Sequence, residues 1–490
     1  MSHDPLRERV GLLLDGEERF SSAVEEVRNP GRPQEVVGTF AVGDPAHIDA
    51  AVRQAAAVQK GWGGSDPADR AAALRRAAER IEEHAERLAV LASRESGSLI
   101  ALCRWEATAA AQAFRNAADH LSAVSGYAEH GDAAIGDRVL VHRRPFGVVA
   151  CIVPWNAPMI LSANKLAAAL ATGNAVVMKP SPLAPLAASR LAQIVATCLP
   201  AGLVSVVGGG ADVGEALLDH DLVRKVSFTG GGATARVIMA RAARTLTPVH
   251  FELGGNDPAL VLEDADLEAA ARGIAAAAFR RGGQVCFAVK RVYVHQAVAA
   301  EFEDLLVAHL DGMRVGDALD ETVTMGPLIS RRQCEDIRAV AARARAVGRE
   351  VVACGVPVGE LADGHFHLPT VVLGAHHEDE VVGIEQFGPI LPIVRSSSEA
   401  EMIRLANDSE YGLCSSIWSQ DDERALAIAG RIEVGVTFVN RHEFSPQGSK
   451  WIPFGGVKQS GIGWENSPAG LGEFLQYHSI DSRSSAAASA

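Results

Sequence analysis

The sequence lacks the features that mark membrane-spanning, secreted and zinc-binding proteins. Its longest apolar runs, such as Val148–Pro154, have the length of a strand and fall far short of the roughly 20 residues that cross a bilayer. Residues Met1–Arg9 mix charges and contain no apolar core, so we expect no signal peptide. The seven cysteines are scattered and form no CxxC pair, which favours reduced thiols in a cytoplasmic protein over a disulfide scaffold or a metal site.

Positive charge is scarce. The 46 Lys and Arg residues are outnumbered by 60 Asp and Glu residues, which leaves a formal net charge of −14. A chain this acidic repels phosphate backbones and anionic lipid, so we expect neither a nucleic acid nor a membrane as partner. An anionic cofactor would need a local basic or dipolar site. The length of 490 residues predicts two or three domains.

The first part of the chain, to about residue 130, is Ala-rich, and its pattern predicts helices. Apolar residues recur at three- and four-residue spacing in Ile48–Trp62, Pro67–Ser93 and Ile100–Tyr127. Residues Arg138–Phe146 are predicted to form an extended arm. At the other end, the Ser- and Ala-rich tail Ser484–Ala490 is expected to be disordered.

Short apolar runs then alternate with helical runs. Strands are predicted at Val148–Val153, Ala175–Met178, Leu203–Val207 and Lys225–Phe228, with helices at Pro158–Ala171, Leu183–Leu199 and Asp212–Leu218 between them. This alternation predicts a parallel sheet covered on both faces, with ligands beyond the carboxyl ends of its strands. Those ends read Pro154-Trp155-Asn156, Lys179-Pro180-Ser181, Gly208-Gly209-Gly210 and Thr229-Gly230-Gly231. A second α/β region is predicted from Glu252 to Phe454, with strands at Ala259–Leu262 and Arg291–His295 and helices at Val298–Leu310 and Ser330–Val347.

Three residues stand out by their surroundings. Cys286 follows a Gly-Gly pair, which would let another group approach its sulfur; the alternative is a buried structural cysteine in a turn. Glu252 ends an apolar strand, where a carboxylate is costly to bury unless it is functional or belongs to a salt bridge. Asn156 follows a strand end, where it is either functional or an ordinary turn or helix-capping residue.

Two glycine-rich turns, 208–214 and 230–232, follow strands and open helices. Such turns can present backbone N–H groups to a phosphate, or they can be plain turns. Neither matches the GxGxxG fingerprint followed by an acidic residue about 20 positions later.

Taken together, these segments resemble the aldehyde dehydrogenase superfamily over nearly the whole chain. The spacing of 34 residues between Glu252 and Cys286 also fits that family. The motifs that carry the resemblance, in family order, are Pro154-Trp155-Asn156, Lys179-Pro180-Ser181, Phe228-Thr229-Gly230, Glu252-Leu253-Gly254-Gly255, Gly283-Gln284-Val285-Cys286, Glu385-Gln386-Phe387-Gly388-Pro389 and Pro453-Phe454-Gly455-Gly456-Val457-Lys458-Gln459-Ser460-Gly461.

The resemblance implies an α/β architecture of the aldehyde dehydrogenase type. A Rossmann-type dinucleotide domain would comprise residues 1–122 and 146–251, and an α/β catalytic domain residues 252–457. A β oligomerisation arm, 123–145, would pair with the C-terminal segment 458–483. Because the strand predicted at Phe474–Ile480 needs a partner edge, we expect a homodimer or a homotetramer.

The resemblance also implies the chemistry, which is oxidation of an aldehyde to a carboxylic acid with NAD(P). Cys286 resembles the nucleophile, which needs either a lowered thiol pKa or a base that takes its proton. The Asn156 amide and the Cys286 backbone N–H would hold the oxyanion, and Glu252 would activate the water that hydrolyses the thioester. Lys165 and Glu465 match positions that help to relay protons.

For the cofactor, Lys179 resembles the residue that binds the adenine ribose, Glu385 the one that binds the nicotinamide ribose, and Phe387 the one beside the nicotinamide. Pro182 replaces the Glu that often favours NAD, and Gly231 replaces a usual Ser, so NAD is expected and NADP is the alternative. The other positions implied to line the cofactor are Ile152, Pro154, Trp155, Asn156, Ser181, Gly208, Phe228, Thr229, Gly230, Gly231, Glu252, Leu253 and Gln333.

The substrate pocket departs from the family pattern at Ala157, Asn164 and Arg280, each of which stands where an aromatic residue is common. We therefore predict a roomier, more polar pocket. Arg280 would pair with a polar or carboxylate group of the substrate, or with an acidic neighbour in the protein. The other expected lining residues are Leu161, Val285, Phe287, Arg441, His442 and Phe454.

Two other functions compete with hydrolytic oxidation. In a CoA-acylating dehydrogenase the thioester passes to CoA, but that class usually lacks a Glu at the position of Glu252. A catalytically silent scaffold on the same fold would tend to lose the nucleophile or the base. The presence of Cys286, Glu252 and Asn156 disfavours both.

Overall fold

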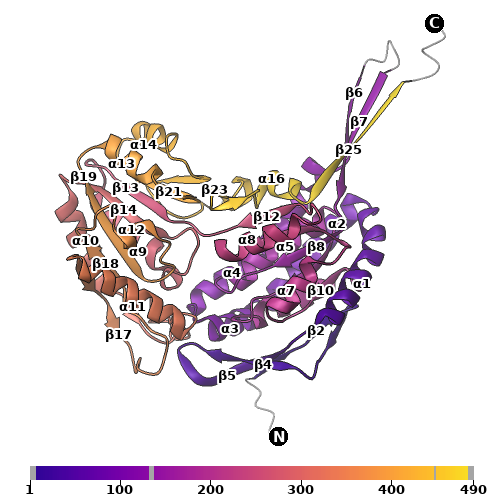
Figure 1. Ribbon diagram of the computed structural model, residues 1–490, viewed down its shortest axis with the longest axis horizontal. Coiled ribbons are helices and arrows are strands. Elements are labelled where there is room, and N and C mark those ends of the chain that lie inside the picture. Colours follow the sequence, from indigo (N-terminus) through magenta and orange to yellow (C-terminus); the bar gives the residue numbers. More distant parts are fainter. Residues whose placement is uncertain (1–6, 132–136, 446–447, 484–490) are drawn as a thin grey trace.

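The computed structural model describes residues 7–131, 137–445 and 448–483. It contains two α/β halves, each built on its own sheet, and an arm of strands that projects from one side (Figure 1). Within these ranges, no helix is long and apolar enough to cross a membrane. Nor do the described side chains include a group of three or more His, Cys, Asp or Glu residues placed to hold a metal ion. The tail predicted to be disordered, 484–490, lies outside the described residues.

The first half is organised around an eight-stranded sheet with the order β24-β12-β11-β8-β9-β10-β2-β3. The five central strands run parallel, and antiparallel strands close both edges. Strand β9 is buried at every position, as expected for a parallel sheet that is covered on both faces. The strands are β2 (Leu12–Leu14), β3 (Glu17–Arg19), β8 (Val148–Ile152), β9 (Ala175–Lys179), β10 (Val204–Val206), β11 (Val223–Thr229), β12 (Val249–Glu252) and β24 (Gly461–Ile462).

Helices of the first half pack around this sheet and share one core with it. The single helix predicted at Pro67–Ser93 is two helices, because His84 leaves helical geometry and its ring nitrogen Nδ1 lies 2.8 Å from the carbonyl oxygen of Arg80. The helices are α1 (Pro45–Gly63), α2 (Pro67–Glu83), α3 (Ala85–Ser96), α4 (Ile100–Val124), α5 (Pro158–Ala171), α6 (Leu186–Ala196), α7 (Ala211–Leu218) and α8 (Gly232–Ala242).

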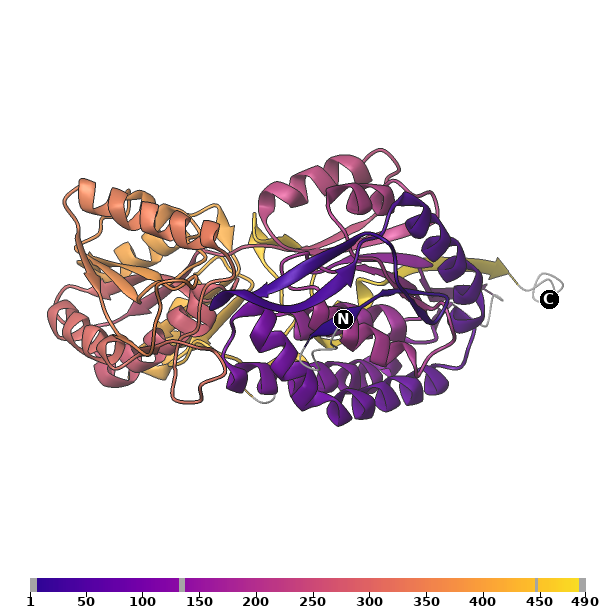
Figure 2. The same ribbon diagram turned by 90° about the horizontal axis from the view of Figure 1, so that it is seen from below.

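Residues 8–41 fold into the five strands β1 to β5 and the turns between them, so the prediction of a helical first part was wrong for this segment. Strands β1 (Glu8–Val10), β4 (Val24–Asn29) and β5 (Arg32–Ala41) form a separate three-stranded sheet. The turn between β4 and β5 contains Pro30-Gly31, and the following apolar run is typical of a hairpin. Figure 2 shows this hairpin reaching from the first half toward the second, where the Pro30 carbonyl oxygen accepts a hydrogen bond from the His365 N–H at 2.9 Å.

The second half contains a seven-stranded sheet with the order β16-β18-β19-β14-β13-β21-β22. All neighbours in it are parallel except β16 and β18. Its strands are β13 (Asp257–Val261), β14 (Val289–His295), β16 (Glu350–Ala353), β18 (Thr370–Leu373), β19 (Ile390–Ser396), β21 (Cys414–Trp418) and β22 (Val436–Val439). Its helices are α9 (Leu267–Phe279), α10 (Ala299–Asp311), α11 (Arg331–Ala346), α12 (Glu380–Gly383), α13 (Glu399–Asn407) and α14 (Asp422–Ala429). Shorter elements are β15 (Arg314–Val315), β17 (Val356–Pro357), β20 (Tyr411–Gly412), β23 (Val457–Lys458) and α15 (Gly448–Trp451).

The projecting arm consists of β6 (Tyr127–His130), β7 (Asp137–Pro145) and β25 (Leu475–Arg483). Strand β25 pairs antiparallel with β7 along its whole length, although the two segments lie more than 300 residues apart. Helix α16 (Ser467–Gly472) leads into β25, while β24 of the same C-terminal segment joins the first sheet. The C-terminal segment therefore belongs partly to the arm and partly to the first half, and the predicted domain limits stay predictions.

Candidate active site

The parallel strands of the first sheet end at one edge, which faces the second half. At this edge the Trp155 ring, just after β8, meets the Phe387 ring of the second half edge to face, with centroids 5.6 Å apart. Because the carboxyl ends of parallel strands lie together, the loops after β9, β10 and β11 share this edge.

A left-handed turn presents Cys286. After α9, the backbone passes through positive φ at Arg281 and then at Gly282 and Gly283. A Cβ at Gly283 would lie 2.3 Å from the Gly388 carbonyl oxygen, so the close approach of these two chain segments requires glycine there. The glycines that made Cys286 stand out in the sequence thus serve the shape of the turn that carries it.

Arg281 fastens this turn to the first half. Its buried guanidinium donates to Ser98 Oγ at 2.8 Å and to the Asn156 carbonyl oxygen at 3.1 Å, and it pairs with Glu106 at 2.5 Å. Glu106 also accepts hydrogen bonds from the backbone N–H groups of Met159 and Ile160 in the first turn of α5. One ion pair therefore joins the cysteine turn, the Asn156 loop and two helices.

Asn156 and Cys286 lie on the wall of one cavity of about 380 Å³. The Asn156 side chain is buried, and its Nδ2 donates to the Gln284 carbonyl oxygen at 3.0 Å, two residues before the thiol. The amide is therefore a hydrogen-bond donor held against the cysteine loop. This position favours the functional interpretation of Asn156 over a helix cap, because its side chain makes no cap bond to α5.

Glu252 ends β12 and is 3% exposed. Among the described residues its Oε1 has no hydrogen-bond partner. Burial, with the negative charge of Glu465 adding to it, raises the pKa of Glu252 well above its usual value. The nearest basic group to Oε1 is His250 Nε2 at 3.8 Å, and burial holds the pKa of that imidazole well below its usual value, so Glu252 does not form the salt bridge that the sequence left as its alternative.

The Cys286 thiol is a weak acid in these surroundings. Burial raises its pKa, and the negative charges of Glu252 and two further carboxylates raise it more. These surroundings do not favour a lowered pKa, which is the first of the two routes to a thiolate that the sequence left open.

Lys165 and Glu465 form a buried ion pair, with Nζ and Oε1 2.7 Å apart. Lys165 lies on α5, and its Nζ also contacts Ser227 Oγ at 3.2 Å. Asn164 Nδ2 donates to the other oxygen of Glu465 at 3.3 Å. The two residues predicted to relay protons are thus in direct contact, next to the Glu252 carboxylate.

The positions predicted for a dinucleotide include polar groups without partners. Lys179 is buried, its Nζ reaches only the Pro180 carbonyl oxygen, at 3.5 Å, among the described residues, and burial lowers its pKa to about 8. Thr229 Oγ1 is buried and unpartnered within the same ranges, and a Cβ at Gly231 would meet nothing within 4 Å. An open glycine turn, a weakly bonded buried ammonium and an unpartnered hydroxyl at the ends of neighbouring strands fit a phosphorylated ribose.

The remaining cofactor positions lie in the second half and at the strand ends of the first sheet. Glu385 accepts from the Gly255 N–H at 3.3 Å, and Gln333 Nε2 donates to the Phe387 carbonyl oxygen at 3.0 Å. Phe228 packs in the core under Gly230, so only its backbone faces the edge. The positions at strand ends along this edge are Ile152, Pro154, Ser181, Gly208 and Leu253.

Most of the predicted substrate residues line the 380 Å³ cavity, but Arg441 and His442 do not. Arg441 is exposed, and His442 is buried behind the wall, where its Nε2 bonds the Phe287 carbonyl oxygen at 2.8 Å. Arg280 reaches Glu443 at 3.1 Å, which is the internal acidic partner that the sequence left as an alternative. The predicted residues that do line the cavity are Ala157, Leu161, Asn164, Arg280, Val285, Phe287 and Phe454.

Sequence reasoning missed several residues around the thiol. Trp105 and His120 line the cavity from α4, and Phe444 packs edge to face against Phe287, with ring centroids 5.5 Å apart. Trp105 and His120 lie on a predicted helix, whose pattern indicates core as readily as pocket, and Phe444 lies in a loop that carried no signal of its own. Aromatic rings therefore form part of the wall near the thiol, alongside Ala157, Asn164 and Arg280, on which the prediction of a roomier, more polar pocket rests. Lys290, also missed, is a buried ammonium beside the Phe387 ring, 5.2 Å from its centroid.

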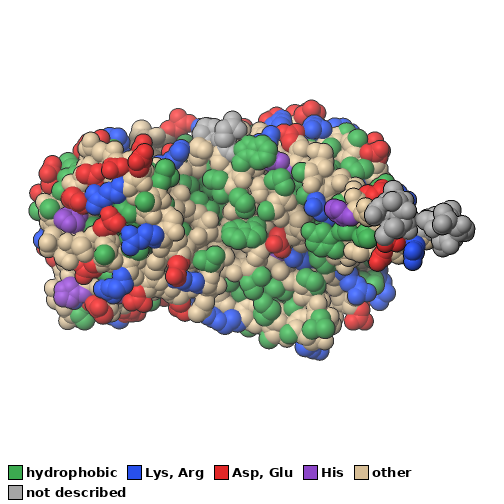
Figure 3. All heavy atoms as spheres, turned by 90° about the horizontal axis from the view of Figure 1, so that it is seen from above, with side chains coloured by type: hydrophobic (Ala, Val, Ile, Leu, Met, Phe, Trp, Pro, Cys, Tyr) green, Lys and Arg blue, Asp and Glu red, His purple; other side chains and the backbone are tan. Residues whose placement is uncertain are grey.

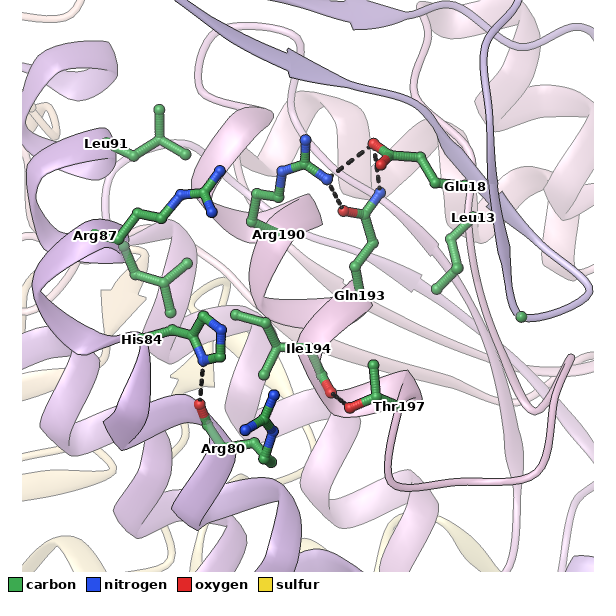
Figure 4. A pocket seen from close by; sticks show the side chains of 12 residues that line it. Leu13, Glu18, Arg80, His84, Arg87, Leu91, Arg190, Gln193, Ile194 and Thr197 are labelled. Carbon is green, nitrogen blue, oxygen red and sulfur yellow. Dashed lines mark hydrogen bonds and ion pairs between the residues drawn. The ribbon is translucent and has the colours of Figure 1, made fainter. Parts of the chain in front are cut away.

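A second cavity, of about 400 Å³, lies between α2, α3, α6 and the N-terminal strands (Figure 4). It contains three arginines, but the protein already pairs its most buried one: Arg190 bonds Glu8, Glu18 and Gln193. Arg87 likewise reaches Glu8 at 3.1 Å. None of the predicted site residues lines this cavity, so the chemistry belongs to the cavity with Cys286.

Comparison with known proteins agrees with this geometry. The profile of the aldehyde dehydrogenase family matches residues 18–480. Betaine aldehyde dehydrogenase of Brucella suis biovar 1 is 36% identical over 461 residues, which cover 92% of either chain. Phenylacetaldehyde dehydrogenase of Pseudomonas fluorescens is also 36% identical, over 448 residues that cover 89% of this chain and 88% of that one. The crystal structure of an NAD-dependent aldehyde dehydrogenase from Sinorhizobium meliloti superposes with a TM-score of 0.94 at 30% identity, covering 99% of this chain and 97% of that chain.

Proposed function

The chain belongs to the aldehyde dehydrogenase family and oxidises an aldehyde to a carboxylic acid with NAD, and we propose that Cys286 carries the reaction through a thioester that water hydrolyses. The observation that carries the proposal is the shared cavity wall of Cys286 and Asn156, with Glu252 buried nearby and its Oε1 without a hydrogen-bond partner among the described residues.

Each of the three residues has one task. The Cys286 sulfur adds to the carbonyl carbon while its proton passes to water in the cavity, and the carbonyl oxygen becomes an oxyanion. The Asn156 amide and the Cys286 backbone N–H donate hydrogen bonds to that oxyanion. After oxidation leaves a thioester, Glu252 takes a proton from water, the hydroxide adds to the acyl carbon, and the sulfur departs as thiolate.

NAD fits the edge of the first sheet. Lys179 and Thr229 offer a buried ammonium and hydroxyl that lack strong partners, and Gly231 leaves room for close approach. Glu385 would hold the nicotinamide ribose, and Phe387 would pack beside the ring. When bound, NAD supplies the acceptor for the hydride. With Pro182 at the position of the usual acidic residue, NADP is the second cofactor to test.

The test of the proposed function is a panel of aldehydes assayed with each cofactor. We expect reduced cofactor and free carboxylic acid in equal amounts, without added CoA. Turnover that required CoA and yielded an acyl-CoA would instead indicate a CoA-acylating aldehyde dehydrogenase. A protein that reduced neither cofactor with any aldehyde would be the catalytically silent scaffold.

Replacing Asn156 with alanine is expected to lower kcat/KM by about 10²–10³-fold, because one donor to the oxyanion is lost. Steady-state kinetics at saturating cofactor measures this change. Unchanged cofactor affinity would separate loss of the oxyanion donor from general damage to the edge of the sheet. A loss of less than about threefold would remove Asn156 from the proposed chemistry.

For the substrate, we propose an aldehyde with an apolar or aromatic tail. The rings of Phe287, Phe444 and Phe454 pack edge to face around the thiol, with centroids 5.5 to 5.9 Å apart. Overall identity does not select a substrate, because two relatives with different names are equally similar.

Because Arg280 pairs with Glu443, Arg280→Ala is expected to change kcat/KM by less than about threefold, equally for neutral and anionic aldehydes. The comparison uses two aldehydes of similar size that differ in one carboxylate. A selective loss on the anionic aldehyde would revive direct pairing of Arg280 with the substrate.

We also propose a cytoplasmic homodimer or homotetramer assembled through the arm. Strand β25 is an edge of the arm sheet and leaves Tyr477 and Ile480 exposed, and an exposed edge strand of this kind needs a partner. Hydrophobic side chains also gather on the half of the molecule that carries the arm, on the face shown in Figure 3. Closed symmetry would pair these surfaces with those of a second copy.

A further inference from the structure

His250 lies on β12 two residues before Glu252, so both side chains point to the same side of the strand. The imidazole is fully buried. Its Nδ1 lies 2.9 Å from Ser227 Oγ, which in turn lies 3.2 Å from Lys165 Nζ. Its Nε2 has no hydrogen-bond partner among the described residues and lies 3.8 Å from Glu252 Oε1, the other unpartnered atom of this site.

The direction of these bonds determines which ring nitrogen carries the proton. The Lys165 ammonium can only donate, so Ser227 Oγ accepts from it, and the one acceptor that its own O–H reaches among the described residues is His250 Nδ1. The Ser227 hydroxyl therefore donates to His250 Nδ1, and the ring proton sits on Nε2. This tautomer directs an N–H toward the Glu252 carboxylate.

His250 is neutral in this position. Burial, together with the positive charges of Lys165 and Lys225, holds its pKa well below the usual value. The charged groups that surround His250 and Glu252 are Lys165 on α5, Lys225 on β11, and Glu465 and Glu473 from the C-terminal segment, and the edge of the ring meets Phe474. His250 is thus a neutral donor beside a buried carboxylate.

We propose that His250 is the positioning residue for Glu252: its Nε2–H donates to the carboxylate, holds it ionised and aims its second oxygen at the water. A small rotation of the Glu252 side chain closes the gap from 3.8 Å to hydrogen-bond distance. The inference rests on the proposed role of Glu252 as the base. An imidazole with a merely structural role would have both nitrogens bonded, because an unmet buried N–H costs free energy.

The test compares His250→Phe and His250→Gln by the rate at which the acyl-enzyme decays, measured across pH. Removal of a donor to a carboxylate raises its pKa, so in His250→Phe we expect the acidic limb of the profile to move up by about one pH unit. The first-turnover burst of reduced cofactor should keep its amplitude. The Gln amide nitrogen reaches the place of Nε2, so His250→Gln should restore most of the shift.

A structural role would give a different result. Equal losses at every pH in both variants, with an unmoved acidic limb, would overturn the proposal. If His250→Phe does not fold, His250→Gln and Ser227→Ala decide the matter. Loss of the Ser227 hydroxyl frees the ring to carry its proton on Nδ1, so we expect a smaller shift in the same direction, and an unmoved limb in Ser227→Ala would contradict the assigned tautomer.

Glu252→Gln separates this inference from the proposed function. Turnover retained in Glu252→Gln would refute the base itself. Turnover lost in Glu252→Gln, with no pH shift in His250→Phe, would refute the role of His250 alone.

Discussion

Replacing Cys286 with alanine is expected to lower kcat/KM for aldehyde oxidation by about 10⁴-fold or more, because no sulfur remains to form the covalent intermediate. The cavity wall and the edge of the first sheet where NAD is proposed to bind should be unaffected, since alanine only removes the thiol. Cofactor reduction, followed optically over hours at high enzyme concentration, measures the residual rate. Binding of NAD by the same variant should equal that of the unaltered protein.

Cys198→Ala provides the matched control. Cys198 is also partly exposed, but it follows α6 and lies outside the cavity that holds Cys286. We expect this variant to keep full activity. Turnover retained in Cys286→Ala, or lost equally in both variants, would contradict the assignment of the nucleophile.

Replacing Glu252 with glutamine is expected to lower kcat by about 10⁴-fold while leaving the first turnover intact. Oxidation to the thioester does not need Glu252 as the base for water, so one equivalent of reduced cofactor should still appear. The enzyme should then accumulate with the acyl group on Cys286, which intact mass spectrometry detects. Glu433→Gln, at an exposed carboxylate paired with Lys458, is the matched control and should turn over normally.

The raised pKa of Glu252 gives hydrolysis a definite pH dependence. Only the ionised carboxylate can take a proton from water, and burial favours the protonated form. The rate of acyl-enzyme decay should therefore fall as the pH falls through this raised pKa, well above the range in which an exposed Glu titrates. A profile that is flat down to pH 5, or an absent burst in Glu252→Gln, would contradict the proposed base.

Local sequence was informative where chemistry depends on residue type and close spacing. The β-α alternation predicted the parallel strands β8 to β11, because strands buried on both faces carry continuous apolar runs. The Gly-Gly pair before Cys286 predicted a turn that another group could approach. The N-terminal strands were missed because the helical pattern of the Ala-rich segments that follow was extended to the whole first part of the chain, residues 8–41 included.

The pocket shows why residue type alone misplaces side chains. His442 follows β22 in the C-terminal loop that was expected to shape the pocket, yet its ring points behind the wall and supports Phe287 through a backbone bond. Arg280 finds its partner in Glu443, 163 residues further along the chain. Trp105 and His120 enter the cavity from a helix whose pattern indicated only a buried face.

The sequence by itself determined the family, the nucleophile, the oxyanion donor and the base as candidates, because those depend on which groups stand at which spacing. Only the tertiary structure decided their electrostatics. Burial raises the pKa of the Cys286 thiol, carboxylates from distant segments raise it further, and Lys165 meets Glu465 across 300 residues. The proposed N–H of His250 toward Glu252 also depends on the fold. The hydrogen bond from Ser227 decides which ring nitrogen of His250 carries the proton, and Ser227, His250 and Glu252 come together only when the chain is folded.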